Sequence, residues 1–262
     1  MIRRLYYLPT DVWEKVSGKR NNNVPPKGMI FIGSGDFQKI GNHYLDLFIA
    51  KCQLKPEHRV LDIGCGIGRI ALPLTTYLNA EGSYDGFDIV KRGIEWCQKN
   101  ISRRFPNFRF IHIDLKNDLY NLSTQQTAKS FVFPYKDHSF DLIVLTSVFT
   151  HMLPEDVENY LQEINRVLDR NGKCLATFFI LNEESKARMS SSEEFNFKFN
   201  RGHYSLLNEQ VKEANIAFEE SYLQDLFLKN QLTEEKKLYG FWSGRPKENS
   251  FDFQDTIILS KP

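Results

Sequence analysis

Three aspartates, each placed where a short apolar run ends, are the residues whose type and spacing could do chemistry in this chain. They are Asp62, Asp88 and Asp114. If these runs are strands of one open α/β sheet, their carboxyl ends share the edge at which such sheets bind ligands. Asp88 lies 20 residues after Gly68, a spacing typical of an acid that binds ribose hydroxyls. The alternative for each aspartate is a loop or helix-capping role.

The stretch 59–70 predicts a strand, a glycine turn and the start of a helix, because apolar residues recur every four positions after the turn. The turn contains Gly64, Gly66 and Gly68. Glycine lets a ligand approach bare backbone, and a helix N-terminus presents unpaired N–H groups. The dinucleotide fingerprint needs a glycine where Arg69 stands, and a carboxylate at Asp62 would repel a pyrophosphate. The pattern favours a ligand without phosphate, and the alternative is a tight turn that binds nothing.

Composition limits the class of protein. A chain of 262 residues with 41% hydrophobic and 26% charged residues is typical of one large globular α/β domain. The net charge of +1 gives no strong field toward nucleic acid or an anionic membrane, so we expect neither as a partner. The four cysteines are widely spaced, which indicates reduced thiols in a cytoplasmic protein and no metal site.

Alternating strands and helices predict a parallel sheet with helices on both faces. We expect Asp36 to begin a helix, and a helix through Val157 and Leu168 to close at Asn171-Gly172. The stretch 115–138 reads as an irregular connection that is either functional or a surface elaboration. Two final strands, 237–242 and 254–259, should pair antiparallel.

Residues 36–181 resemble the core of the class I S-adenosylmethionine-dependent methyltransferases. The segments that carry the resemblance are 60–69 (Val-Leu-Asp-Ile-Gly-Cys-Gly-Ile-Gly-Arg), 86–89 (Gly-Phe-Asp-Ile), 112–115 (His-Ile-Asp-Leu), 133–143 and 147–152. The resemblance implies a Rossmann-like fold with a mostly parallel seven-stranded sheet, order 3-2-1-4-5-7-6, and an antiparallel C-terminal hairpin. We expect a single domain over 1–262, comprising an N-terminal extension (1–35), a cofactor-binding core (36–181), a variable substrate-side segment (182–213) and a C-terminal helix and hairpin (214–262).

The same resemblance implies S-adenosylmethionine as cofactor and S-adenosylhomocysteine as product. Asp62 would face the methionine end, Asp88 the ribose, and Asp114 the adenine. The predicted cofactor-binding set is Asp62, Gly64, Cys65, Gly66, Gly68, Asp88, Ile89, Asp114, Leu115, Thr146 and Ser147. Thr146 and Ser147 would lie near the sulfonium.

The acceptor side is not carried over from the family. His151 follows the fourth predicted strand and is the first candidate for a general base, with bracing of its loop as the alternative. His203 is the second candidate. The predicted substrate-binding residues are Phe197, Tyr204, Trp242 and Arg245, for which packing under a long loop is the alternative. An arginine would suit a carboxylate or phosphate on the acceptor.

We therefore expect methyl transfer from S-adenosylmethionine to oxygen or nitrogen of a small-molecule acceptor. Neither an Asn-Pro-Pro-Tyr nor an Asp-Pro-Pro-Tyr segment follows the fourth predicted strand, so the signature of amino-group DNA methyltransferases is absent. One alternative is a protein that binds the cofactor without catalysis and works through a partner. Another is a nucleotide-dependent oxidoreductase, against which Arg69 argues.

Overall fold

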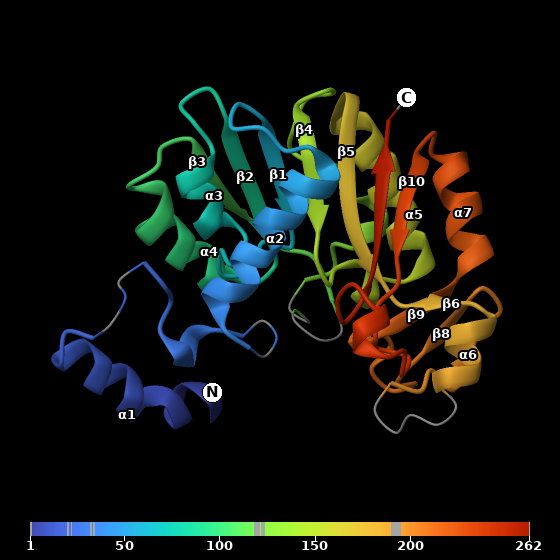
Figure 1. The fold of residues 1–262 in the computed structure, drawn as a ribbon, viewed down its shortest axis with the longest axis horizontal. Coiled ribbons are helices and arrows are strands. Elements are labelled where there is room, and N and C mark those ends of the chain that lie inside the picture. The colour runs from blue at the N-terminus through green and yellow to red at the C-terminus, as the bar shows by residue number, and fades with distance from the viewer. Residues whose placement is uncertain are drawn as a thin grey trace. The chain divides into compact units, whose positions relative to one another are not determined.

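The computed structural model describes residues 2–19, 21, 23–31, 33, 35–117, 121, 124–189 and 195–261. Its main feature is a seven-stranded sheet in the order β10-β11-β5-β4-β1-β2-β3, drawn in Figure 1. The strands are β1 (Arg59–Ile63), β2 (Ser83–Asp88), β3 (Phe108–His112), β4 (Phe140–Leu145), β5 (Leu168–Phe178), β10 (Thr233–Leu238) and β11 (Asp255–Ser260). β4 runs parallel to β1 and β5, whereas β11 runs antiparallel to β5 and β10. The predicted fold class and strand order are confirmed.

The chain divides into two compact units. Unit 1 comprises Met1–His58 and Cys65–Ile113, and unit 2 comprises Arg59–Gly64 and Asp114–Pro262. The helices of unit 1 are α1 (Ile2–Val16), α2 (Phe37–Cys52), α3 (Ala71–Tyr77) and α4 (Lys91–Cys97). Those of unit 2 are α5 (Pro154–Val167), α6 (Glu183–Met189) and α7 (Glu220–Lys229). None of the helices in the described residues is long and apolar enough to cross a membrane.

In unit 1, α2 begins where the sequence predicts. The Asp36 carboxylate accepts a hydrogen bond from the Lys39 amide at 2.8 Å, which satisfies one N–H of the first turn. α2 packs against α3 at Gly41, where a Cβ would lie 2.5 Å from the carbonyl oxygen of Arg69. α4 packs against β2 and β3. These contacts hold the start of α3, and with it the end of the glycine turn.

In unit 2, α5 packs against β5 and α7, and α7 packs against β10. The predicted helix end at Asn171-Gly172 is wrong. α5 ends at Val167, Leu168 is already extended, and Asn171 and Gly172 lie inside β5. The register of β4 against β5 shifts beside them, and Asn171 has a φ of +62°. The Asn-Gly pair belongs to a strand irregularity, although the sequence suggested a helix end. A strand irregularity and a helix end each need a residue with a left-handed backbone, so the same pair suits either structure.

A second sheet continues from the carboxyl end of β5, in the order β6-β9-β8-β7. Its strands are β6 (Ile180–Leu181), β7 (Phe199–Asn200), β8 (Tyr204–Leu206) and β9 (Ile216–Glu219). Figure 1 shows β6, β8 and β9 beside α6 beyond the end of β5. The segment 182–213, predicted only as variable and irregular, thus supplies one helix and two short strands; residues 190–194 of that segment lie outside the described residues.

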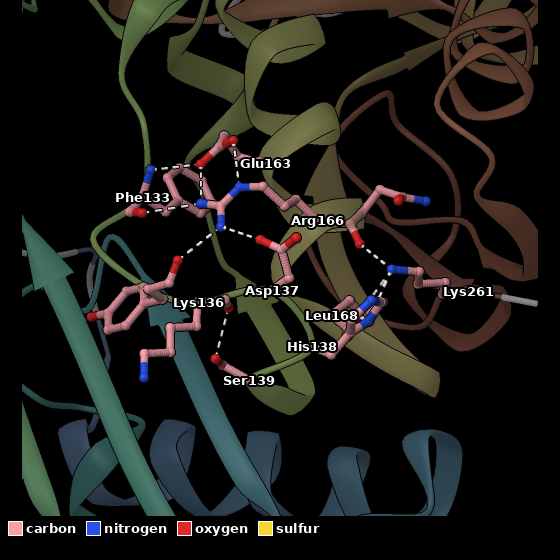
Figure 2. A network of polar contacts seen from close by, with 11 residues as sticks. Phe133, Lys136, Asp137, His138, Ser139, Glu163, Arg166, Leu168 and Lys261 are labelled. Carbon is pink, nitrogen blue, oxygen red and sulfur yellow. Dashed lines mark hydrogen bonds and ion pairs between the residues drawn. The ribbon is translucent and has the colours of Figure 1, made fainter.

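Arg166 ties the chain before β4 to α5, as Figure 2 shows. Its guanidinium donates to the carboxylates of Glu163 and Asp137 and to the backbone oxygens of Phe133 and Tyr135. Guanidinium–carboxylate pairs with several fixed donors hold geometry well. Phe133, Tyr135 and Asp137 precede β4 in the chain. The network therefore positions the amino end of β4.

Candidate functional site

The glycine turn of unit 1 is held by the acid at the end of β2. The amide of Gly66 donates to Oδ2 of Asp88 at 2.8 Å, and the amide of Val90 donates to Oδ1 at 2.7 Å. The amide of Cys65 donates to the carbonyl oxygen of Phe87 at 3.1 Å. Asp88 therefore shapes the turn by accepting two backbone hydrogen bonds.

Asp88 is 8% exposed, and burial raises the pKa of its carboxyl, while the amides of Val90 and Gly66 oppose that rise. Each carboxylate oxygen has two lone pairs, and each accepts one of these amides. Each oxygen therefore has a second acceptor position, and a ribose diol could donate its two hydroxyl protons to these positions. The ribose assignment stays a prediction, now with a structural role for the same residue.

Helix α4 lies directly against the turn. A Cβ on Gly93 would lie 2.3 Å from the carbonyl oxygen of Gly66, a separation that real Cβ atoms essentially never show. Gly66 and Gly68 have φ values of +58° and +78°, which side-chain-bearing residues rarely adopt. A Cβ on Gly68 would also meet Sγ of Cys97 at 2.9 Å. Local packing therefore requires glycine at positions 68 and 93, whether or not a ligand binds.

Cys65 and Ile89 are two further predicted cofactor-binding residues of unit 1. Cys65 is buried, and its side chain fills the space beside Gly86, where a Cβ would be 2.9 Å from Sγ. The carbonyl oxygen of Ile89 lies 3.2 Å from Nε2 of His112. Both residues flank Asp88 and the turn; their predicted contact with cofactor stays a prediction.

Unit 2 contains the acid and glycine that end β1. Asp62 is 1% exposed and lies within the strand. Gly64 has a φ of +75°, and a Cβ there would lie 2.5 Å from Cγ2 of Val148. The absence of a side chain at Gly64 therefore lets the end of β1 approach the loop that follows β4.

Asp114 and Leu115 of unit 2 are both contacted by the side chain of Asn121. Nδ2 of Asn121 donates to Oδ1 of Asp114 at 2.8 Å and to the carbonyl oxygen of Leu115 at 2.9 Å. The Asp114 side chain is exposed, and the Leu115 side chain is buried. Residues 118–120 and 122–123 of the predicted irregular stretch 115–138 lie outside the described residues.

The loop after β4 is held by a hydroxyl and amide cluster. The amide of Ser147 donates to Oγ1 of Thr177 at 2.7 Å, and Oγ of Ser147 donates to Oε1 of Gln254 at 2.9 Å. Oγ1 of Thr177 donates to the same Oε1 at 2.7 Å. Ser147, which is exposed, has a φ of +57°, and Thr146 beside it is half-buried. Thr146 and Ser147 were predicted from the sequence, and their contact with the cofactor stays a prediction; Thr177 and Gln254 were not predicted.

His151 lies in the short helix Phe149–His151 that follows this loop. Its Nδ1 lies 2.9 Å from the carbonyl oxygen of Glu213. A carbonyl only accepts, so Nδ1 is the donor in this contact. Burial lowers the pKa of His151, against the hydrogen bonds to the backbone of Glu213 and Ala214. The ring is therefore neutral at physiological pH, in the protonation state that a general base needs.

The second base candidate is placed differently. His203 is exposed and stacks on Tyr222, with ring centroids 4.0 Å apart. Tyr204, the first residue of β8, is half-buried beside it, with ring centroids 5.5 Å apart. The exposed, stacked ring of His203 has no contact that favours it over His151 as the general base. Both roles stay predictions.

The three remaining acceptor candidates have partners within unit 2. Phe197 and Trp242 are each 3% exposed and belong to a buried apolar cluster with Phe179. Nε1 of Trp242 donates to Oδ2 of Asp255 at 2.7 Å. Arg245 pairs with Glu184 at 2.7 Å and stacks over Tyr239 at 4.8 Å. These contacts are those of the packing alternative for the two aromatic residues, and Glu184 pairs with the guanidinium that is predicted to bind an anionic acceptor. The substrate-binding roles of the three residues stay predictions.

A family model described as a methyltransferase domain matches residues 54–231, more than half of the chain. The chain belongs to this methyltransferase-domain family. It is 33% identical over 132 residues to the uncharacterized methyltransferase YcgJ of Bacillus subtilis (strain 168), a match covering 50% of this chain and 44% of YcgJ. It is 27% identical over 127 residues to the tRNA N(3)-cytidine methyltransferase METTL2 of Gallus gallus, covering 45% of this chain and 30% of that protein. The chain thus spans less than half the length of these relatives.

The fold of the methyltransferase domain is shared with the PH0226 protein of Pyrococcus horikoshii OT3. That structure has a TM-score of 0.58 at 16% sequence identity and covers 89% of this chain and 95% of its own. Membership in the family makes S-adenosylmethionine the cofactor. Asp88 of unit 1 fits this cofactor, because its carboxylate oxygens have acceptor positions left for hydroxyl groups after binding the Gly66 and Val90 amides. Among the described residues no group of acidic, histidine or cysteine side chains could hold a metal ion.

Proposed function

We propose that this methyltransferase domain transfers a methyl group from S-adenosylmethionine to an oxygen or nitrogen of a small molecule. The observation that carries the proposal is His151, which follows β4 as a half-buried imidazole whose Nδ1 contacts a backbone carbonyl and whose pKa is lowered by burial. The family match supports the cofactor, and the balanced charge of the chain supports a small acceptor over a polyanion. Less than half of YcgJ and of the tRNA methyltransferase METTL2 is matched, so the acceptor class comes from this chain's own residues.

The sulfonium of the bound cofactor supplies an already activated methyl group. The work left to the chain is alignment, desolvation and, for a protonated acceptor, removal of one proton. Fixed alignment of two reactants supplies about 7–11 kcal/mol, whereas a general base contributes about 10²–10⁴-fold. In this scheme Nε2 of His151 takes the acceptor proton, and the Glu213 carbonyl steadies the imidazolium through Nδ1–H.

Asp88 and the glycine turn act on the cofactor in this proposal. The hydrogen bond from Gly66 fixes the carboxylate, which then presents its other lone pairs to the ribose hydroxyls. Asp62 would face the amino-acid end, and Asp114 with Leu115 the adenine. His203 is the second candidate for the general base.

One rival has a specific observation behind it. The similarity to a tRNA methyltransferase favours an RNA acceptor, and the net charge of +1 disfavours it. A domain that binds the cofactor without turnover is the second rival, and a nicotinamide-dependent oxidoreductase is the third.

Labelled methyl transfer separates these functions. The protein is incubated with methyl-labelled S-adenosylmethionine and, in separate arms, a deproteinised metabolite extract or total tRNA. We expect label in the metabolite arm alone. Label in tRNA contradicts a small acceptor, and calorimetric binding of S-adenosylhomocysteine with no label in either arm supports the non-catalytic rival. Binding of a nicotinamide cofactor in place of S-adenosylhomocysteine supports the oxidoreductase.

A further inference from the structure

Gln254 is a half-buried residue directly before β11 whose amide is oriented by two hydroxyl groups. Oγ1 of Thr177 already accepts from the amide of Ser147, so its own proton needs an oxygen partner. That oxygen is Oε1 of Gln254, which also accepts from Oγ of Ser147. The hydroxyl protons therefore fix which end of the Gln254 amide is oxygen and which is nitrogen.

The orientation leaves the NH₂ group of Gln254 directed away from the cluster. Within the part of the chain that the structure describes, no group accepts a hydrogen bond from its Nε2. An amide nitrogen carries two donors and no acceptor. The group that completes it must therefore be a hydrogen-bond acceptor such as an oxygen.

The cluster occupies the end of the sheet at which open α/β folds bind ligands. Thr177 is the next-to-last residue of β5, and Ser147 follows the end of β4 by two positions. Register places Thr177 opposite Thr256 of β11, which brings Gln254 to the same edge. Ligands of such sheets bind outside the carboxyl ends of the strands.

Ser147 adopts an unfavourable backbone conformation in this cluster. Its φ of +57° is left-handed, a region that residues other than glycine rarely adopt. Both its amide and its hydroxyl are used in the cluster, which holds the residue in that conformation. Such residues cluster at functional sites, where surrounding contacts maintain an unfavourable backbone.

We propose that Gln254 binds the methyl acceptor, through a hydrogen bond from Nε2 to a carbonyl or carboxylate oxygen of that molecule. Thr177 and Ser147 are positioning residues that orient the amide. The inference rests on the proposed methyl transfer and deepens it, because it restricts the acceptor to molecules that carry such an oxygen near the methylated atom.

Gln254→Glu tests the donor without removing the cluster. A carboxylate has the same shape and still accepts both hydroxyls, but it presents an oxygen where the N–H donors were. The probe is methyl-labelled S-adenosylmethionine with a dilution series of deproteinised metabolite extract. We expect transfer at low extract concentration to fall about 10- to 100-fold, with recovery at high concentration. Wild-type transfer at every dilution overturns the inference.

Gln224→Glu is the matched control, because it makes the same charge change on an exposed position of α7. We expect wild-type transfer from it, and wild-type S-adenosylhomocysteine affinity from both variants. Gln254→Leu distinguishes a carboxylate oxygen from a carbonyl oxygen on the acceptor. If the acceptor carries a carboxylate, we expect slower transfer from Gln254→Glu than from Gln254→Leu, because like charges repel. If it carries a neutral carbonyl, we expect similar transfer from both variants. Rates are compared where melting curves show each variant folded, so that lost stability cannot imitate lost binding.

The labelled product gives an independent reading. Mass spectrometry should find a carbonyl or carboxylate oxygen in it, and a product without one overturns the inference even if Gln254→Glu is impaired. An inactive wild-type protein defeats the proposed function and this inference together. An active wild-type protein with an unaffected Gln254→Glu variant defeats this inference alone.

Discussion

The amide of Gly66 lies 2.8 Å from Oδ2 of Asp88, and this hydrogen bond joins the glycine turn to the end of β2. The other carboxylate oxygen accepts from Val90. One buried side chain thus sets the shape of the turn and is also the residue that is predicted to bind the ribose. Loss of cofactor binding in an Asp88 variant has two possible causes, and stability measurements separate them.

Asp88→Ala should lower both stability and cofactor affinity. Removal leaves the Gly66 and Val90 amides without their acceptor, and the buried charge that disappears offsets part of the loss. We expect about 2–4 kcal/mol less free energy of unfolding in the absence of ligand. Chemical denaturation and calorimetry with S-adenosylhomocysteine measure the two effects, with Asp46→Ala on the exposed side of α2 as control. Unchanged stability contradicts the bracing role, and unchanged affinity contradicts the ribose role.

Gly93→Ala tests whether α4 shapes the turn from behind. The added methyl group would lie 2.3 Å from the carbonyl oxygen of Gly66, and the obstacle is backbone, so no side chain can rotate away. Overpacking of this kind costs about 1–3 kcal/mol. We expect a lower melting temperature and weaker S-adenosylhomocysteine binding, whereas Glu95→Ala on the exposed face of α4 should keep the wild-type affinity. Wild-type affinity in Gly93→Ala would show that the turn tolerates displacement.

The parts predicted from sequence have strong local signals. Alternating periodicity predicted the parallel strands of the main sheet and Asp36 predicted the start of α2, because each signal lies within a few residues. The strand order came from the resemblance to the methyltransferase family, because no local signal specifies which strands are neighbours. The second sheet was missed because β6 and β7 have two residues each, too few for any pattern. The Asn171-Gly172 pair was misassigned because a strand irregularity and a helix end both use such residues.

The Gln254 cluster shows why part of the candidate site could not be predicted. Thr177 and Gln254 meet through the register of β11 against β5, which depends on pairing between distant segments. No glycine motif lies beside either residue in the sequence to mark them. Likewise the Glu213 carbonyl that contacts Nδ1 of His151 is 62 residues away in the chain.

Paired substitutions of His151 separate catalysis from bracing. Asn places its Nδ2 where Nδ1 of the imidazole lies, so His151→Asn can keep the donor to the Glu213 carbonyl but has no base. His151→Gln places its amide nearer the position of Nε2. If His151 is the base, both variants should lose about 10²–10⁴-fold in turnover with little change in cofactor affinity. Retention of activity by His151→Asn alone assigns the bracing role.

The pH profile gives a second measure of the same residue. Burial lowers the pKa of His151 below its ordinary 6.5, so the neutral base forms at a pH below that value. Turnover should therefore rise with pH along an acidic limb whose midpoint lies under 6.5, and this limb should be absent from the residual activity of His151→Gln. A midpoint above 6.5 in the wild-type protein contradicts the assignment.

Asp255 should make the stability of the protein fall as pH rises. Its carboxylate is 2% exposed and accepts from the amides of Gly240 and Ile180 and from Nε1 of Trp242, all at 2.7 Å. Burial nevertheless raises the pKa of Asp255 to about 6, from an ordinary 3.8. Between these values the folded protein binds a proton that the unfolded chain does not. The contribution to stability is therefore complete below the unfolded pKa and is lost as pH rises through 6.

The difference in unfolding free energy between the wild-type protein and Asp255→Asn isolates this effect, because other titrating groups are common to both. We expect the wild-type protein to lose about 2 kcal/mol relative to Asp255→Asn between pH 4.5 and pH 8. Asp225→Asn, on the exposed side of α7, is the control and should show no such trend. Trp242→Phe removes one donor to the carboxylate, so it should move the midpoint of the loss to higher pH. Parallel pH profiles for wild type and Asp255→Asn would mean that the three N–H donors outweigh burial and keep Asp255 ionised throughout this range.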